Sequence, residues 1–184
     1  MSRFPSRVFD DLVRGPRPVV LIDGGAGAGK TTLAQELATA WPIPRPQLVS
    51  MDDLYPGWDG LAAGSERIHR DVLRTAEPGY WQWDWHTGTT TAWVPLDATK
   101  PLIVEGCGAL TPATRAQATA AIWVSGSASS RRDRAEGRIG DGFAGHWEQW
   151  AAQERDHWRR HRPRSLADWI YDGIRFHAGP ARTG

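Results

Sequence analysis

The sequence of 184 residues lacks several features that would place it in a special class of protein. It contains one cysteine, Cys107, so no disulfide can form within the chain, which fits a reducing cytoplasm. No run approaches the ~18 consecutive apolar residues of a membrane-spanning helix. Residues 1–11 lack the apolar core of a signal peptide. We therefore expect a cytoplasmic protein that has no membrane partner.

An excess of one charge sign is also missing. The chain has 22 Lys and Arg residues against 21 Asp and Glu residues, which gives a net charge of +1. Such a chain has no general field that draws it to nucleic acid or to a membrane surface, so any partner must be recognised locally. The composition, 40% apolar and 23% charged, is that of an ordinary globular protein. The length suits a single domain over residues 1–184, and a homo-oligomer stays open.

Short apolar segments alternate along the chain with segments of helical periodicity. The pattern predicts core strands at residues 18–23, 47–51, 101–105, 121–125 and 168–171. It predicts helices at residues 30–41, 58–75, 111–119, 129–138 and 146–161. Continuously apolar strands that alternate with helices are typical of a parallel sheet covered on both faces. We therefore predict an α/β fold with three layers, α/β/α, around a parallel five-stranded sheet.

A glycine-rich loop follows the first predicted strand. The pattern Gly24-x-x-x-x-Gly29-Lys30-Thr31 matches the phosphate-binding P-loop in full, with a strand before it and a helix after it. Glycines allow successive N–H groups to point at phosphate oxygens, and the helix adds its positive end. Lys30 would bind the β- and γ-phosphates, Thr31 would ligate Mg²⁺, and Thr32 would bind the α-phosphate. The predicted nucleotide-binding residues are Gly24, Gly25, Ala26, Gly27, Ala28, Gly29, Lys30, Thr31 and Thr32.

Acidic residues follow two other predicted strands, at the sheet edge where ligands of open α/β folds bind. Glu105 ends the third core strand and would hold Mg²⁺ directly or through water; its alternative role is to cap a neighbouring N–H. Asp52 follows the second strand and would take the proton of an attacking hydroxyl, with Asp53 as the alternative base. No arginine lies in residues 49–58, where an acceptor phosphate would need one, so the pattern favours an alcohol acceptor.

A basic helix is predicted at the start of residues 129–146. Its arginines are Arg131, Arg132, Arg134 and Arg138. Arg134 and Arg138 are four residues apart and share a helix face, so we predict that they stabilise transition-state charge as part of an arginine lid. The alternative is a solvated helix in which Asp133 and Glu136 are the partners of the arginines.

Residues 80–95 show strand periodicity around a turn, which predicts a small β-arm inserted into the main fold. The chain has 11 Trp residues, and several of them fall in this arm. Alternation places Trp81, Trp83 and Trp85 on one face and Asp84 on the other. The arm either lines an acceptor pocket or only packs onto the sheet. The candidate acceptor contacts are Asp53, Tyr55, Tyr80, Trp83 and Asp84.

Residues 22–34, 49–55 and 103–106 together resemble the uridine kinase-like branch of P-loop kinases. The nearer match is an actinobacterial group labelled uridine kinase-like or ATP-binding protein. Its members are similar in residues 55–61, in Trp83-Asp84-Trp85, in Arg134-x-x-x-Arg138 with Asp141, and in His146-Trp147. The resemblance implies that Asp52 is the base, that Glu105 lies on the Mg²⁺ side, and that Arg134 and Arg138 belong to the lid. Lids of this kind often place Asp after the second Arg, where this chain has Ile139.

Together these patterns predict a kinase that transfers the γ-phosphate of Mg·ATP to a hydroxyl of a small molecule, with a nucleoside as the leading acceptor. No Asn-Lys-x-Asp motif for reading guanine is present, which favours ATP. A nucleoside monophosphate kinase stays open because Arg67, Arg70 and Arg74 precede the arm. A sugar, shikimate-like or antibiotic kinase also stays open, as does a regulatory ATPase switch with no small acceptor.

Overall fold

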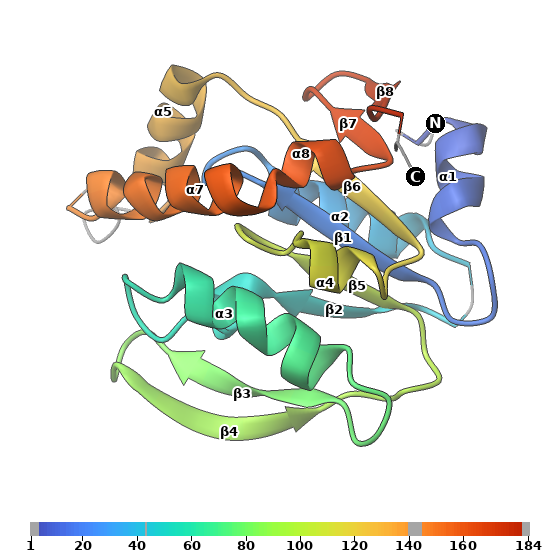
Figure 1. The fold of residues 1–184 in the computed structure, drawn as a ribbon, viewed down its shortest axis with the longest axis horizontal. Coiled ribbons are helices and arrows are strands. Elements are labelled where there is room, and N and C mark those ends of the chain that lie inside the picture. Colours follow the sequence, from blue (N-terminus) through green and yellow to red (C-terminus); the bar gives the residue numbers. More distant parts are fainter. Residues whose placement is uncertain (1–3, 43, 140–144, 182–184) are drawn as a thin grey trace.

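A mixed sheet forms the middle layer of the computed structural model, which describes residues 4–42, 44–139 and 145–181 (Figure 1). Among these residues the sheet has six strands in the order β2-β5-β1-β6-β7-β8. Their bounds are β1 (Val19–Gly24), β2 (Gln47–Ser50), β5 (Leu102–Glu105), β6 (Ala120–Val124), β7 (Trp169–Tyr171) and β8 (Phe176–Ala178). The first five are parallel, so their carboxyl ends meet at one edge of the sheet.

The predicted fold class is confirmed, but the sheet has one strand more than the sequence indicated. β8 pairs antiparallel with β7 at the edge. The turn between them is closed by the carboxylate of Asp172, whose Oδ1 accepts hydrogen bonds from the backbone N–H groups of Ile174 and Arg175, each at 2.9 Å. The prediction missed β8 because three residues, Phe-His-Ala, form neither an apolar run nor a clear alternation.

Alternate side chains of β1 enter two cores, one on each face of the sheet. Val20 and Ile22 belong to a core cluster with buried residues of α1 (Ser6–Leu12) and α2 (Lys30–Ala40). Leu21 packs on the other face with residues of α3 (Leu61–Arg67) and α7 (Trp147–His161). This alternation explains why the strand is continuously apolar, as expected for a sheet covered on both sides.

Two predicted helices are shorter in the structure. Helix 58–75 consists of α3 and the π-helical turn η2 (Ile68–Val72). It begins only at Leu61 because a turn precedes it, in which Gly60 N–H donates to Gly57 O. Helix 111–119 is reduced to the single turn α4 (Pro112–Arg115). The remaining helices are α5 (Ala128–Ile139) and α8 (Pro163–Leu166), together with the 3₁₀ turn η1 (Met51–Asp53).

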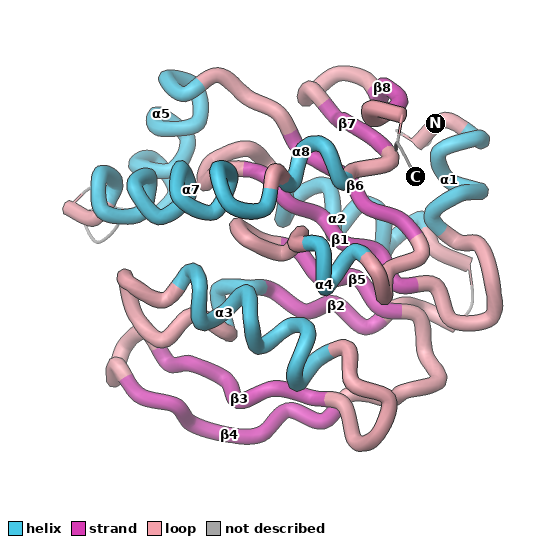
Figure 2. The backbone as a smooth tube through the Cα atoms, viewed as in Figure 1, coloured by secondary structure: helices cyan, strands magenta, loops and turns pink. Residues whose placement is uncertain are grey.

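The β-arm forms as predicted and lies beside α3, away from the main sheet (Figures 1 and 2). It consists of β3 (Gly79–Asp84) and β4 (Thr89–Pro95), which pair antiparallel. The register is irregular opposite Trp81 to Trp83, where β4 has one residue more than β3. Trp81 packs against Trp93 and is 49% exposed, whereas Trp85 contacts Trp58. That the arm's tryptophans share one face stays a prediction. No helix in the described ranges is long and apolar enough to cross a membrane.

Candidate active site

The phosphate loop connects the carboxyl end of β1 to the first residue of α2, as predicted. Gly27 and Gly29 have φ angles of 73° and 97°, which favour glycine because other residues are strained there. Gly29 is also the N-cap of α2, so Lys30 begins the helix and the last loop amides lie at its positive end. This is a geometry that can hold an anion, in particular a phosphate.

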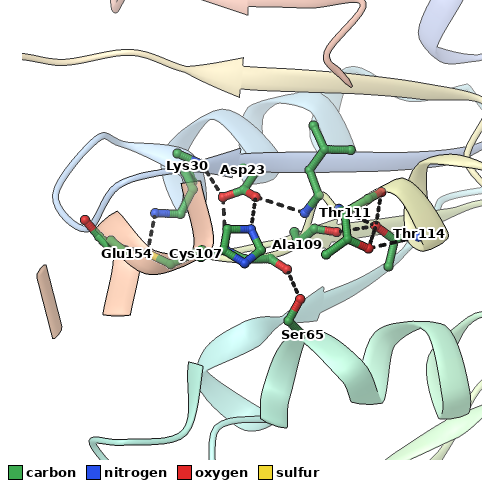
Figure 3. Close-up of polar contacts among 12 residues, drawn as sticks. Asp23, Lys30, Ser65, Cys107, Ala109, Thr111, Thr114 and Glu154 are labelled. Atoms are coloured by element: carbon green, nitrogen blue, oxygen red, sulfur yellow. Dashed lines mark hydrogen bonds and ion pairs between the residues drawn. The ribbon is translucent and has the colours of Figure 1, made fainter. Parts of the chain in front are cut away.

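Lys30 is only 7% exposed, and its side chain points toward Cys107 (Figure 3). Its Nζ donates to Gly25 O at 3.0 Å and to Cys107 Sγ at 3.3 Å. Burial acts to lower the pKa of Lys30, but the Cys107 sulfur and three surrounding carboxylates together raise that pKa to about 12. Burial also raises the pKa of the Cys107 thiol above its ordinary range. Lys30 is therefore held as a charged ammonium group by carboxylates, of which Glu105 is the strongest.

Three side-chain oxygens converge beside Lys30. Thr31 Oγ1 and Ser50 Oγ each donate to Glu105 Oε1 at 3.1 Å. Mg²⁺ prefers oxygen ligands and is usually held by one or two carboxylates together with substrate phosphates, so this donor set fits the ion. Among the described residues, no group of three or more His, Cys, Asp or Glu side chains could hold a metal alone. Ser50 was not among the predicted ligands, since a serine that ends a strand carries no distinctive signal.

Asp52 and Asp53, the two acids that follow β2, have different surroundings. The carboxylate of Asp53 accepts a hydrogen bond from Gln82 Nε2 at 3.2 Å and one from Tyr80, both on the arm. The side chain of Asp52 is exposed, and its backbone carbonyl accepts a hydrogen bond from Trp85 Nε1 at 2.8 Å. Asp53 therefore anchors the arm, whereas Asp52 presents its carboxylate at the edge of the sheet near Glu105.

The other predicted acceptor contacts are mostly engaged within the protein. Tyr55 is 1% exposed and donates to Cys107 O at 2.7 Å. Burial, followed by the carboxylate of Asp53, raises the pKa of Tyr80 to about 12. The carboxylate of Asp84 accepts hydrogen bonds from the backbone N–H of His86 at 2.8 Å and from Thr87, which closes the hairpin turn. Tyr55 thus has no exposed surface for a ligand.

An aromatic cluster that the sequence did not indicate lies between the arm and α7. Trp58 stacks on His146 with 4.2 Å between ring centroids and 10° between planes. Its ring centroid also lies 4.8 Å from that of Trp85 and 6.4 Å from that of Trp150. The sequence could not indicate the stack of Trp58 on His146, because the two residues are far apart along the chain. The cluster adjoins Asp52, to whose carbonyl Trp85 donates.

The sequence left open an acceptor that carries a phosphate, because three arginines precede the arm: Arg67, Arg70 and Arg74. In the structure each of them binds another group of the protein. Arg67 Nη1 donates to Leu54 O at 2.8 Å. Arg70 makes two hydrogen bonds to the carboxylate of Asp71, at 2.9 and 2.7 Å. Arg74 donates to Glu77 O and packs over the ring of Trp93 at 5.1 Å. The contact of Arg67 reaches Leu54, which ends the turn that carries Asp52, whereas the contacts of Arg70 and Arg74 lie farther along the chain.

The lid helix α5 lies against the phosphate loop. Arg134, which is exposed, donates from Nε to Gly27 O at 2.7 Å. Arg131, which was not among the predicted site residues, is buried and donates to Ala26 O at 3.1 Å. Residues 140–144 of the predicted lid, including Asp141, lie outside the described residues, as does the side chain of Arg138. The predicted catalytic role of Arg138 thus stays a prediction.

No protein-family model matches the sequence, and no curated protein matches it either. Solved structures do match. A possible uridine kinase from Bacillus stearothermophilus is 18% identical, with a TM-score of 0.58 over 86% of this chain and 90% of its own. A candidate fructose transport system kinase from Silicibacter sp. TM1040 is 19% identical, with a TM-score of 0.57 over 92% of this chain and 94% of its own. The chain has the P-loop kinase fold.

A buried acid, Asp23, binds the start of the phosphate loop in this P-loop kinase fold. Asp23 is fully buried, and its carboxylate accepts hydrogen bonds from the N–H groups of Gly24 at 2.6 Å, Gly108 at 3.0 Å and Leu110 at 2.9 Å. Figure 3 shows Asp23 between Lys30 and the segment that carries Ala109 and Thr111. The carboxylate thereby links the start of the phosphate loop to the segment after β5. Sequence reasoning treated Asp23 only as the end of a strand.

The described residues of the P-loop kinase fold enclose at least two cavities. One, of about 620 Å³, lies beside the phosphate loop and is lined by Gly25, Trp123, Ser127, Arg131 and Asp172 among others. It offers space next to the loop for the rest of a nucleotide. The other, of about 880 Å³, lies between α3, α4 and α7 and is lined by none of the predicted site residues.

Replacing Glu105 by Gln is expected to raise the Mg²⁺ concentration needed for nucleotide binding by about tenfold or more. Burial raises the pKa of Glu105, the charge of Lys30 opposes the rise, and the charge of Asp52 adds to it. Glu105 therefore takes up a proton at a higher pH than an exposed glutamate, and Mg²⁺ affinity should fall as pH is lowered through that raised pKa. Magnesium titrations of the wild type and of Glu105→Gln at several pH values check this. If Mg²⁺ affinity depended on pH equally in both proteins, Glu105 would not be the Mg²⁺ ligand.

Proposed function

We propose that the protein is an ATP-dependent kinase that phosphorylates a hydroxyl group of a small molecule. The observation that carries the proposal is the placement of Asp52. Its exposed carboxylate lies at the same sheet edge as the phosphate loop and close enough to Glu105 to raise that residue's pKa. A carboxylate beside the phosphates is what a hydroxyl acceptor needs, because the hydroxyl must lose its proton as it attacks.

The reaction would use the residues as follows. Asp52 orients the acceptor hydroxyl and accepts its proton while the acceptor oxygen forms a bond to the γ-phosphorus. The bond between that phosphorus and the β–γ bridging oxygen breaks, and ADP leaves. Lys30 and Arg134 stabilise the charge on the transferring group. Thr31, Ser50 and Glu105 would hold Mg²⁺, which when bound would neutralise phosphate charge.

Two observations bear on the class of acceptor. The arginines that could bind a phosphate on the acceptor are already bonded within the protein: Arg67 to Leu54 O, Arg70 to Asp71 and Arg74 to Glu77 O. This argues against an acceptor that carries a phosphate, such as a nucleoside monophosphate. Aromatic rings gather beside Asp52, around Trp58 and Trp85, and such rings bind planar groups by stacking. We therefore place a nucleoside first, as in the uridine kinase-like resemblance. A sugar hydroxyl is second, since one structural neighbour is described as a fructose transport system kinase.

The experiment is a measurement of ADP release from Mg·ATP against a panel of nucleosides, nucleoside monophosphates, sugars and aminoglycosides. We expect one nucleoside to raise ADP release well above the rate with ATP alone, and the phosphorylated product to appear in equal amount. Stimulation by monophosphates alone would contradict the role given to Asp52. A rate that no acceptor raises, with ATP still bound, would favour the regulatory ATPase switch.

A further inference from the structure

A second buried acid, Glu154, touches the phosphate loop from the middle of α7 (Figure 3). The side chain is 2% exposed, and its Oε1 accepts a hydrogen bond from the backbone N–H of Ala26 at 2.5 Å. The two residues are 128 positions apart in the sequence. A buried carboxylate is costly unless it is paired and hydrogen-bonded, so the contact requires a partner cation.

Arg131 of α5 supplies that cation and completes a closed set of contacts around one residue, Ala26. Its Nη1 lies 3.3 Å from Glu154 Oε2 and donates to Ala26 O at 3.1 Å. The loop is thus held at Ala26 on both sides, with its N–H bonded to α7 and its carbonyl bonded to α5. Charge-assisted hydrogen bonds of this kind are stronger and more specific in geometry than neutral ones.

The surroundings of Arg131 keep its guanidinium in this position. The rings of Trp147 and Trp158 lie 5.9 and 5.5 Å from its central carbon, and the residue is 9% exposed. The guanidinium also fills the space beside Gly25, where an added Cβ would lie 2.0 Å from Nη1. Arg131 is therefore buried with its guanidinium bonded to protein groups, whereas Arg134 on the same helix is exposed and reaches the loop through one hydrogen bond from Nε to Gly27 O.

The set of contacts also reaches Lys30. Cys107 Sγ lies 3.3 Å from Glu154 Oε1 and 3.3 Å from Lys30 Nζ. The negative charge of Glu154 is one of the causes that raise the pKa of Lys30. A change at Glu154 is thus transmitted both to a backbone amide of the loop and to the ammonium group that would meet the phosphates.

We propose that Glu154 and Arg131 are positioning residues, which fix the phosphate loop at Ala26 and connect α5 and α7 to nucleotide binding. Neither residue contacts the transferring phosphate; they act through the conformation of the loop. The proposal rests on the proposed function in one respect, that the loop binds Mg·ATP or Mg·ADP. Its structural part, the clamp on Ala26, does not depend on any acceptor.

The test uses the variants Glu154→Gln, Arg131→Gln and the double variant. Gln has nearly the size of Glu and keeps one oxygen acceptor, so the fold is expected to persist while the ion pair is lost. We expect hydrogen exchange at the Ala26 amide to become at least about tenfold faster in Glu154→Gln. We expect Mg·ADP binding, measured by calorimetry, to weaken about tenfold in each single variant and little further in the double variant, because the residues act as a pair.

A matched control is the ion pair between Arg115 and Asp168, which joins α4 to the start of β7 with two contacts of 2.9 Å and does not touch the loop. Arg115→Gln should lower thermal stability and leave Mg·ADP affinity and Ala26 exchange unchanged. Unchanged affinity and exchange in a folded Glu154→Gln variant would overturn the proposal. A wild-type protein that binds no Mg·ADP would count against the proposed function, whereas Ala26 exchange would still decide whether the pair holds the loop.

Discussion

Replacing Asp52 by Asn is expected to lower phosphoryl transfer by a factor of ~10²–10⁴, the usual contribution of a general base, with Mg·ATP binding close to that of the wild type. The amide is isosteric with the carboxylate but cannot accept the acceptor's proton. The side chain is exposed, and the hydrogen bond from Trp85 goes to the backbone carbonyl, which the substitution keeps. Because the amide has the size of the carboxylate, we expect the fold to be kept.

The matched control for Asp52 is its neighbour. Asp53 accepts hydrogen bonds from the arm, so Asp53→Asn should raise the KM for the acceptor more than it lowers kcat. Steady-state kinetics with the acceptor found in the panel, together with a nucleotide-binding titration, separate the two effects. Full transfer activity in Asp52→Asn would contradict the role of Asp52 as the base. Either Asp53 would then be the base, or the acceptor group would be a phosphate, which needs none.

Replacing Lys30 by Ala is expected to abolish detectable phosphoryl transfer and to weaken Mg·ATP binding by at least ~10²-fold, as when a principal electrostatic donor is removed. The variant also leaves Glu105, Glu154 and Asp23 without the cation between them. Removing one partner from buried charges costs on the order of 3–5 kcal/mol of unfolding free energy. The variant should therefore be less stable as well as inactive.

Lys30→Met keeps the apolar stem and removes only the charge, so it shows how much of both losses comes from the charge. The natural control is Lys100, the other lysine of the chain, which is exposed and lies 3.7 Å from Asp97. Lys100→Met should change neither the melting temperature nor ATP affinity measurably. A folded Lys30→Met protein that binds Mg·ATP with wild-type affinity would disprove the role of Lys30 in phosphate binding.

Local sequence was sufficient for the elements that depend on local chemistry. The run from Val19 to Gly24 is apolar and β-branched, the glycines permit positive φ angles, and Lys30 follows the N-cap of a helix. Each of these features is dictated within a few residues of the chain. The same holds for the placement of Asp52 and Glu105 at strand ends, because the carboxyl ends of parallel strands meet at one edge.

The sequence by itself determined the α/β class, the phosphate loop and the sheet edge at which the site lies. Only the tertiary structure decided which side chains meet there. It joined Glu154 to Ala26, Trp58 to His146 and the arm to Asp53, and it added β8 to the sheet. Such contacts join residues distant in the chain, and packing selects them among many equivalent acids, arginines and tryptophans. Periodicity and spacing carry no information about that choice, because they describe only neighbours along the chain.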